Sequence, residues 1–119
     1  MSNSFIYLAS QSPRRQELLK QIGVRFEMLL PSAGEDTESI ETPLPGEKAR
    51  HYVERVTLAK SAIALDRWKK SGLPWAPILC ADTTVSLPNH ADGEILGKPI
   101  DVSDAQRILN MLSGQTHEV

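Results

Sequence analysis

The sequence has a single cysteine, few aromatic residues and no long apolar run. Because Cys80 is the only cysteine among 119 residues, no disulfide can form within the chain, and a cytoplasmic protein is expected. No window reaches the roughly 18 consecutive apolar residues of a membrane span. The N-terminus also lacks the charged lead and apolar run of a signal peptide. The sequence therefore predicts neither secretion nor a membrane partner.

An excess of positive charge is also missing. The 13 lysines and arginines are outnumbered by 15 aspartates and glutamates, which gives a formal net charge of −2. A general nucleic-acid binder needs a broad basic field, so nucleic acid is not expected as a partner. A small phosphorylated ligand needs only a local basic cluster. With 40% apolar residues, the chain can bury one core, and its length suits a single domain over residues 1–119.

Several common catalytic signatures are absent. The chain has no GxxxxGK[ST] phosphate loop and no GxSxG, HExxH or CxxC motif. Its three histidines show no metal-ligand spacing and are expected to be surface or structural residues.

The sequence does contain alternating strand and helix patterns. Strands are expected at residues 5–9, about 24–30, 78–87 and 94–96, with a hairpin loop at 88–93 and an acidic loop at 31–45. One helix begins at Ser12 as N-cap, with Pro13 behind it, and stops at Gly23. Others are expected at about 45–70 and, capped by Ser103, at 104–112. The tail 116–119 resembles the opening of a further strand, so the chain is expected to lack a C-terminal part. This order predicts an α/β fold with a mixed sheet and flanking helices.

The turn between the first strand and the first helix combines hydroxyl and guanidinium groups. Ser10 and Ser12 precede Arg14 and Arg15 at a helix N-terminus, which attracts anions. Arginine adds planar donors that match phosphate oxygens. Cations at this end oppose the helix dipole, and an anionic ligand would remove the conflict. The turn is interpreted either as a phosphate-binding site or as a pair of solvated arginines.

Lys60 interrupts an apolar stripe on the second expected helix. The stripe consists of Ala49, Val53, Val56 and Ile63. Lysine is rarely buried without a partner, so Lys60 either has a functional partner or extends to solvent at the edge of the stripe.

Other polar residues have two interpretations each. Asp82 follows an apolar strand, where a carboxylate serves as general base or metal ligand, or else turns the chain. Lys98 lies between Gly97 and Pro99. Its side chain is either held in one direction by this backbone or solvated in a loop. Glu35 and Asp36 either bind a divalent cation or belong to a solvated acidic loop. Cys80 is expected to be a small core residue rather than a reactive thiolate.

Four segments together resemble the Maf family, in its order and spacing. They are LASQSPRR (residues 8–15), ADTTV (81–85), ILGKP (95–99) and LSGQTH (112–117). The family consists of nucleoside triphosphate pyrophosphatases first linked to septum formation. Its fold is a two-lobed α/β structure around a deep cleft, similar to the inosine-triphosphatase-like fold. Family chains continue further, so the resemblance implies that residues 1–119 are the N-terminal portion of one Maf-like domain.

The resemblance implies a chemistry and a set of site residues. It implies hydrolysis of a nucleoside triphosphate to monophosphate and pyrophosphate, assisted by Mg²⁺ or Mn²⁺, in a protein that often forms homodimers. Asp82 matches the proton acceptor, which would orient the water that attacks the α-phosphorus. Asp36 matches an acidic position that is usually Glu, a role that Glu35 could take. The residues matching positions that hold phosphate are Ser10, Arg14, Arg15, Lys60 and Lys98.

The resemblance also implies a substrate. The subgroup acting on dTTP and UTP has arginine after Ser-Pro and threonine after the strand aspartate, as Arg14 and Thr83 stand here. The subgroup acting on 7-methyl-GTP resembles Ser-Pro-Trp-Arg and Asp-Gln instead. Two alternatives stay open: a non-catalytic nucleotide-binding regulator of cell division, and an inert fragment.

Overall fold

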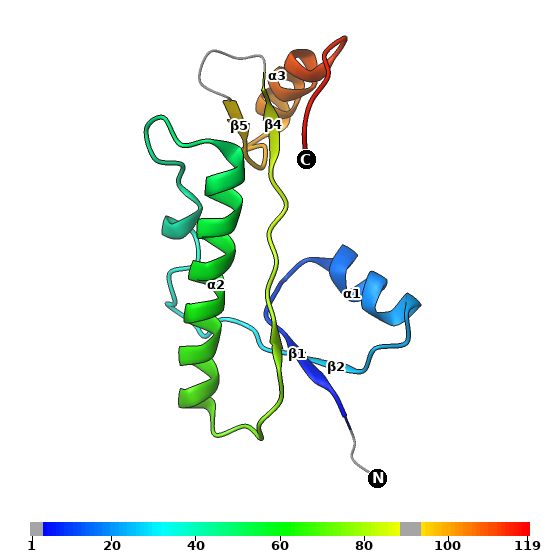
Figure 1. Ribbon diagram of the computed structural model, residues 1–119, viewed down its shortest axis with the longest axis vertical. Helices are drawn as coiled ribbons and strands as arrows, with labels where there is room; N and C mark the ends of the chain where they lie inside the picture. Colours follow the sequence, from blue (N-terminus) through cyan, green and yellow to red (C-terminus); the bar gives the residue numbers. More distant parts are fainter. Residues whose placement is uncertain (1–3, 89–93) are drawn as a thin grey trace. The chain divides into compact units, whose positions relative to one another are not determined.

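The computed structural model describes residues 4–88 and 94–119 (Figure 1). The chain divides into two compact units. Unit 1 comprises Met1–Glu41 and Val56–Ala81, and unit 2 comprises Thr42–Arg55 and Asp82–Val119. The greater part of the expected hairpin loop, residues 89–93, lies outside the described residues.

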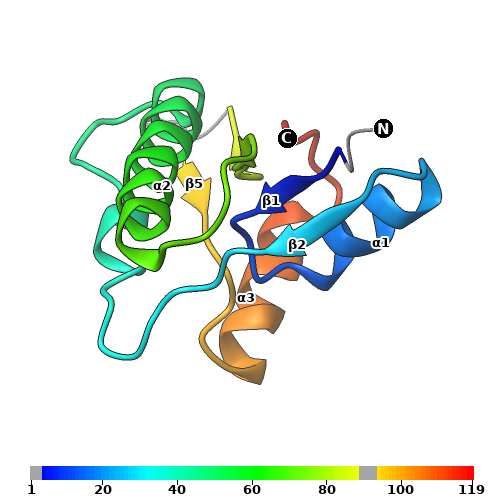
Figure 2. The ribbon, with the colours of Figure 1, turned by 90° about the horizontal axis from the view of Figure 1, so that it is seen from below.

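Unit 1 is built on a parallel sheet of three strands in the order β2-β1-β3. The elements up to the end of this sheet are β1 (Ile6–Leu8), α1 (Pro13–Gln21), β2 (Phe26–Met28), the 3₁₀ helix η1 (Ser39–Glu41), α2 (Ala49–Ser71) and β3 (Ile78–Leu79). Leu8 of β1 is in register with Met28 on one side and Leu79 on the other. Figure 2 shows β1 and β2 side by side. Because the connection from β1 to β2 and the connection from β2 to β3 run in opposite directions across the sheet, right-handed crossovers place α1 and residues 56–71 of α2 on opposite faces (Figure 1).

The core of unit 1 forms where the sheet meets α2. Tyr7, Leu29, Ala64 and Ala76 form one buried cluster. The hydroxyl of Tyr7 donates a hydrogen bond of 2.6 Å to the carbonyl oxygen of Pro74, which satisfies its polar end. The strand β1 is therefore the central, best-covered element of the unit.

The start of α1 agrees with the sequence prediction. The Ser12 hydroxyl accepts a hydrogen bond from the backbone N–H of Arg15 at 3.3 Å, and Pro13 occupies the first turn. Gly23 follows the helix with φ of +74°, a conformation that glycine adopts without strain.

Two expectations on element bounds are wrong. The second helix begins at Ala49 rather than near residue 45, because Leu44–Glu47 forms a turn around Gly46 with a backbone hydrogen bond of 3.0 Å. The single strand expected at 78–87 is two strands, since β3 ends at Leu79 and the next begins at Val85. These two strands pair in different sheets, so the intervening residues have no ladder partner in either.

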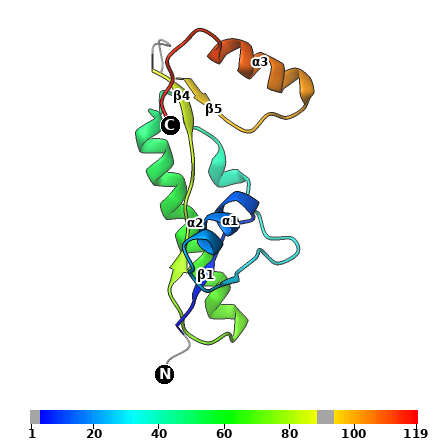
Figure 3. The same cartoon turned by 90° about the vertical axis from the view of Figure 1, so that its right-hand side faces the viewer.

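Unit 2 contains an antiparallel pair of strands and a helix. Its elements after residue 82 are β4 (Val85–Leu87), β5 (Glu94–Leu96) and α3 (Val102–Leu112). Figure 3 shows β4 and β5 side by side. Ser86 of β4 pairs with Ile95 on one side and, through two backbone hydrogen bonds of 2.9 Å, with Glu118 on the other. The expected strand-like tail is thus present as a bridge.

The N-cap of α3 is Asp101 rather than Ser103, so that expectation is also wrong. The carboxylate of Asp101 accepts a hydrogen bond of 2.8 Å from the backbone N–H of Asp104. The helix begins at Val102, which places Ser103 inside its first turn. Asp101 and Ser103 are both residue types that cap helices, and they lie two positions apart. The local sequence alone therefore does not identify which of them is the N-cap.

Candidate functional site

The carboxyl end of β1 lies at a topological switch point of unit 1. The chain passes from β1 to β2 on one side, and β3 lies on the other. Ligands of open α/β sheets bind outside the carboxyl ends of strands at such a point. The pairing of β1 with β3 continues past Leu8 through a hydrogen bond of 3.0 Å from Ala9 N–H to the carbonyl oxygen of Leu79. Ser10 is the next residue, so the serine–arginine turn begins at this edge.

Within that turn, the structure brings together Ser10, Ser12 and Arg15. The Ser10 hydroxyl accepts hydrogen bonds from the backbone N–H of Ser12 at 3.2 Å and from Nη1 of Arg15 at 3.1 Å. The Ser12 hydroxyl accepts the Arg15 backbone N–H. The side chain of Arg14 is exposed. The turn therefore holds one guanidinium in place at a helix N-terminus and presents the other to solvent.

Lys60 has a carboxylate partner. Its Nζ lies 2.8 Å from Oε1 of Glu41, and the two side chains are 22% and 32% exposed. Val56, one turn earlier on α2, is fully buried. Ala49, Val53 and Ile63 of the predicted stripe are half-buried, so Val56 is its one buried member, and Lys60 is partly buried beside a counter-ion.

Arg67 is a site-forming residue that the sequence analysis missed. Its guanidinium pairs with both oxygens of Glu35, with Nε at 3.2 and 3.1 Å, and Nη1 donates to the carbonyl oxygen of Leu29 at 2.8 Å. The Arg67 side chain is 12% exposed. The 4-3 spacing of the apolar stripe reaches residue 67 at its next step after Ile63, and this signal could have found it.

The acidic loop is ordered by its own carboxylates. The hydrogen bond from Arg67, helped by Ser32, holds the pKa of Glu35 at about 2. Asp36 is exposed, and its Oδ1 accepts the backbone N–H groups of Glu38 and Ser39 at 3.1 Å each. Hydrogen bonds, chiefly from the Ser39 side chain, lower the pKa of Asp36. Glu35 and Asp36 therefore act as an anchor and as a cap for η1, and a substrate role for Asp36 stays a prediction.

The acidic residues form no preformed metal centre in the described part of the chain. Among residues 4–88 and 94–119, no three or more His, Cys, Asp or Glu side chains gather closely enough to hold an ion. The Mg²⁺ or Mn²⁺ implied by the family resemblance stays a prediction.

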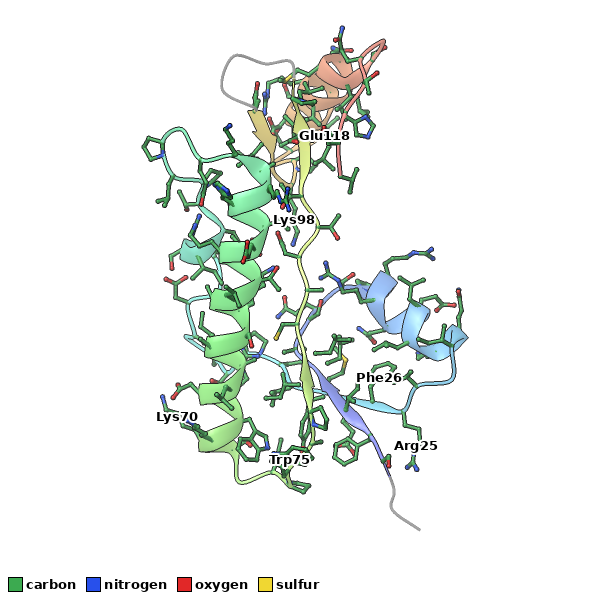
Figure 4. The ribbon with its side chains drawn as sticks, in the orientation of Figure 1. Arg25, Phe26, Lys70, Trp75, Lys98 and Glu118 are labelled. Atoms are coloured by element: carbon green, nitrogen blue, oxygen red, sulfur yellow. The ribbon has the colours of Figure 1, made fainter. Side chains whose placement is uncertain are left out.

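The remaining predicted site residues belong to unit 2. Oδ2 of Asp82 accepts a hydrogen bond of 3.0 Å from the hydroxyl of Thr84, which is 8% exposed. Thr83 is exposed, and so is Lys98, which follows β5 and is labelled in Figure 4. The carboxylate of Asp82 is therefore oriented by a buried hydroxyl, while the roles of Thr83 and Lys98 stay predictions.

Cys80 packs against the core of unit 1, as the sequence analysis predicted. Burial raises the pKa of its thiol, although Arg67 and Lys60 act in the opposite direction. In the described part of the chain, no helix combines the length and the apolar character that crossing a membrane requires.

Comparison with known proteins gives one consistent result. A family model described as Maf-like protein matches residues 5–119. A protein of Burkholderia orbicola (strain AU 1054) named dTTP/UTP pyrophosphatase is 60% identical over 114 residues, which are 96% of this chain and 52% of that protein. Proteins of the same name from Burkholderia pseudomallei (strain 1710b) and Albidiferax ferrireducens are each 55% identical, over 99% and 98% of this chain and 54% and 56% of their own lengths. The chain thus spans about half the length of the curated relatives it matches. Since the family model accounts for nearly every residue of the sequence, the chain belongs to the Maf-like protein family.

Proposed function

We propose that this chain carries the triphosphate-binding part of a pyrophosphatase that converts dTTP and UTP to their monophosphates. The observation that supports this most directly is the turn from Ser10 to Arg15 at the switch point of the unit 1 sheet. The names of the relatives supply the substrate, since dTTP and UTP are the nucleotides in those names.

The turn suits a phosphate group for electrostatic reasons. The dipole of α1 favours negative charge at its N-terminus, where Pro13 has no N–H and the Arg15 N–H is bound to the Ser12 hydroxyl. The Ser10 hydroxyl holds one guanidinium nitrogen of Arg15, so less side-chain entropy is lost when phosphate oxygens bind. Arg14 adds a second cation from the exposed face of the same turn.

The reaction we propose is an in-line hydrolysis. Asp82 accepts a proton from a water molecule whose oxygen attacks the α-phosphorus, the bond from that phosphorus to the bridging oxygen breaks, and pyrophosphate leaves. The hydrogen bond from Thr84 orients the Asp82 carboxylate for this role. Arg14, Arg15, Lys60 and Lys98 are assigned to stabilising the phosphate charge, and losing one such contact typically costs about 10²–10³ in rate.

A divalent cation belongs to the proposal as a companion of the substrate. Mg²⁺ usually keeps several waters and binds through phosphate oxygens plus one or two carboxylates, so it needs no cage of protein ligands. The proposal extends to a cytoplasmic location, which the single cysteine supports. It also extends to a homodimer acting on free nucleotides, which the family resemblance supports.

The test is the release of dTMP and pyrophosphate from dTTP in the presence of Mg²⁺. We expect Asp82→Asn to retain nucleotide binding and the melting temperature of the parent, while its turnover falls by at least about 10²-fold. Thr84→Ser keeps the hydroxyl that orients Asp82 and is the matched control, expected to stay near the parent rate. Pyrophosphate release by Asp82→Asn at the parent rate would remove Asp82 from the mechanism. Binding without turnover in the parent would favour the non-catalytic regulator.

A further inference from the structure

Lys60 and Glu41 form an ion pair that the proposed function does not explain. Lys60 is assigned to a phosphate, yet its Nζ lies 2.8 Å from a carboxylate oxygen of Glu41. Both side chains are only partly exposed, at 22% and 32%. A carboxylate in this position binds the ammonium group that a phosphate would contact, and its charge repels an approaching anion.

The position of Glu41 is determined by the loop that carries it. Glu41 ends η1, whose first turn is capped by Asp36. One residue before Asp36, Glu35 is bound to Arg67 of α2. Lys60 and Arg67 are seven residues apart, so they lie two turns apart on the same face of the helix. The loop is therefore attached to α2 at two points, through the pair of Glu35 with Arg67 and through the pair of Glu41 with Lys60.

We propose that Glu41 is an internal counter-ion of Lys60 that a nucleotide phosphate must displace, so that Glu41 sets the affinity of the site for anions. Glu41 is then a positioning residue that acts through Lys60. This inference rests on the proposed function, because it needs Lys60 to contact phosphate. It predicts that removing the Glu41 charge strengthens binding, whereas removing an ordinary structural contact would weaken it.

The first measurement follows the Lys60 amine directly. The chain is labelled with an amine-acetylating reagent, and mass spectrometry compares Lys60 with the exposed reference Lys48. Ion pairs near the surface are worth up to about 1 kcal/mol, so Glu41→Gln is expected to raise the relative reactivity of Lys60 by up to about 5-fold. Saturating dTTP should then protect Lys60 in both proteins.

The second measurement is the dissociation constant of dTTP. We expect Glu41→Gln to lower this dissociation constant by up to about 5-fold. Glu38→Gln is the matched control, because it removes the same charge from an exposed side chain of the same loop and should leave the affinity unchanged. In a Lys60→Gln background, Glu41→Gln should have no effect, since the pair it disrupts is already lost.

The outcomes separate the inference from the function on which it rests. An unchanged dTTP affinity in Glu41→Gln, with Lys60 more reactive and still protected by dTTP, would overturn the counter-ion role and leave the pyrophosphatase proposal intact. Equal tightening by Glu38→Gln would also overturn it, because the effect would then be a general one of net charge. Absence of dTTP protection at Lys60 in every protein would overturn the inference and the phosphate role of Lys60, whereas absence of dTMP release would overturn the pyrophosphatase proposal.

Discussion

Arg67 joins three parts of unit 1, so its replacement is expected to destabilise the fold well beyond an ordinary surface change. Its guanidinium binds Glu35 in the acidic loop and the carbonyl oxygen of Leu29 at the end of β2. Methionine at this position would keep most of the apolar stem but remove every one of these hydrogen bonds. Glu35 would remain at the site, with the Ser32 N–H and hydroxyl as its remaining partners.

The magnitude follows from the Glu35 carboxylate. The Arg67 hydrogen bond is the largest cause that lowers the pKa of Glu35 from 4.5 to about 2, a difference that corresponds to roughly 3 kcal/mol at about 1.4 kcal/mol per pKa unit. Since the carboxylate is 19% exposed, solvent screening reduces this to about 2 kcal/mol. The lost hydrogen bond to Leu29 adds about 1 kcal/mol. Arg67→Met is thus expected to lower the free energy of unfolding at pH 7 by about 2–3 kcal/mol.

The same pair predicts a dependence on pH. A carboxylate whose folded pKa is depressed contributes stability that is fully present above its unfolded pKa and is lost as pH falls through the folded one. The contribution of the Glu35–Arg67 pair to the free energy of unfolding should therefore be complete above about pH 5 and should decline from pH 4.5 towards pH 2. The difference in the free energy of unfolding between the parent and Arg67→Met should therefore become smaller as the pH falls over that range.

Urea unfolding followed by circular dichroism at pH 7 and pH 3 measures both effects. Lys70→Met is the control, because Lys70 forms an exposed pair with Asp66 on the same helix, with 76% and 62% exposed side chains. That pair is expected to contribute at most about 0.5 kcal/mol. If Arg67→Met costs no more than this control at pH 7, the proposed anchoring of the loop is refuted.

Two further predictions concern the caps of α3 and the choice of base. Asp101→Ala is expected to lower the free energy of unfolding in urea by about 1 kcal/mol, because Asp101 caps α3. Ser103 does not cap the helix, so Ser103→Ala should change this free energy by no more than about 0.5 kcal/mol. The reverse order would contradict the observed start of the helix. Combining Arg14→Trp with Thr83→Gln is expected to lower the preference for dTTP over 7-methyl-GTP by about tenfold or more in competition binding, and an unchanged ratio would show that these residues do not recognise the base.

Much of the local structure was predictable because its causes are local. The Ser12 cap lies three residues from the N–H it binds, and Gly23 ends α1 through its own backbone conformation. The stripe on α2 follows from helical periodicity, which also marked Lys60 as a residue that either has a partner or extends to solvent. Errors arose where two local solutions were similar, as with Asp101 and Ser103.

By itself, the sequence determined the alternation of strands and helices, the turn of serines and arginines, and the family to which the chain belongs. Only the tertiary structure decided that residues 78–87 are divided between two sheets, because strand pairing depends on which partners the fold supplies. The tertiary structure likewise decided that Glu41 forms an ion pair with Lys60 and that Glu35 forms an ion pair with Arg67. These partners are 19 and 32 residues apart in the chain, so the path of the acidic loop over α2 brings their charges together.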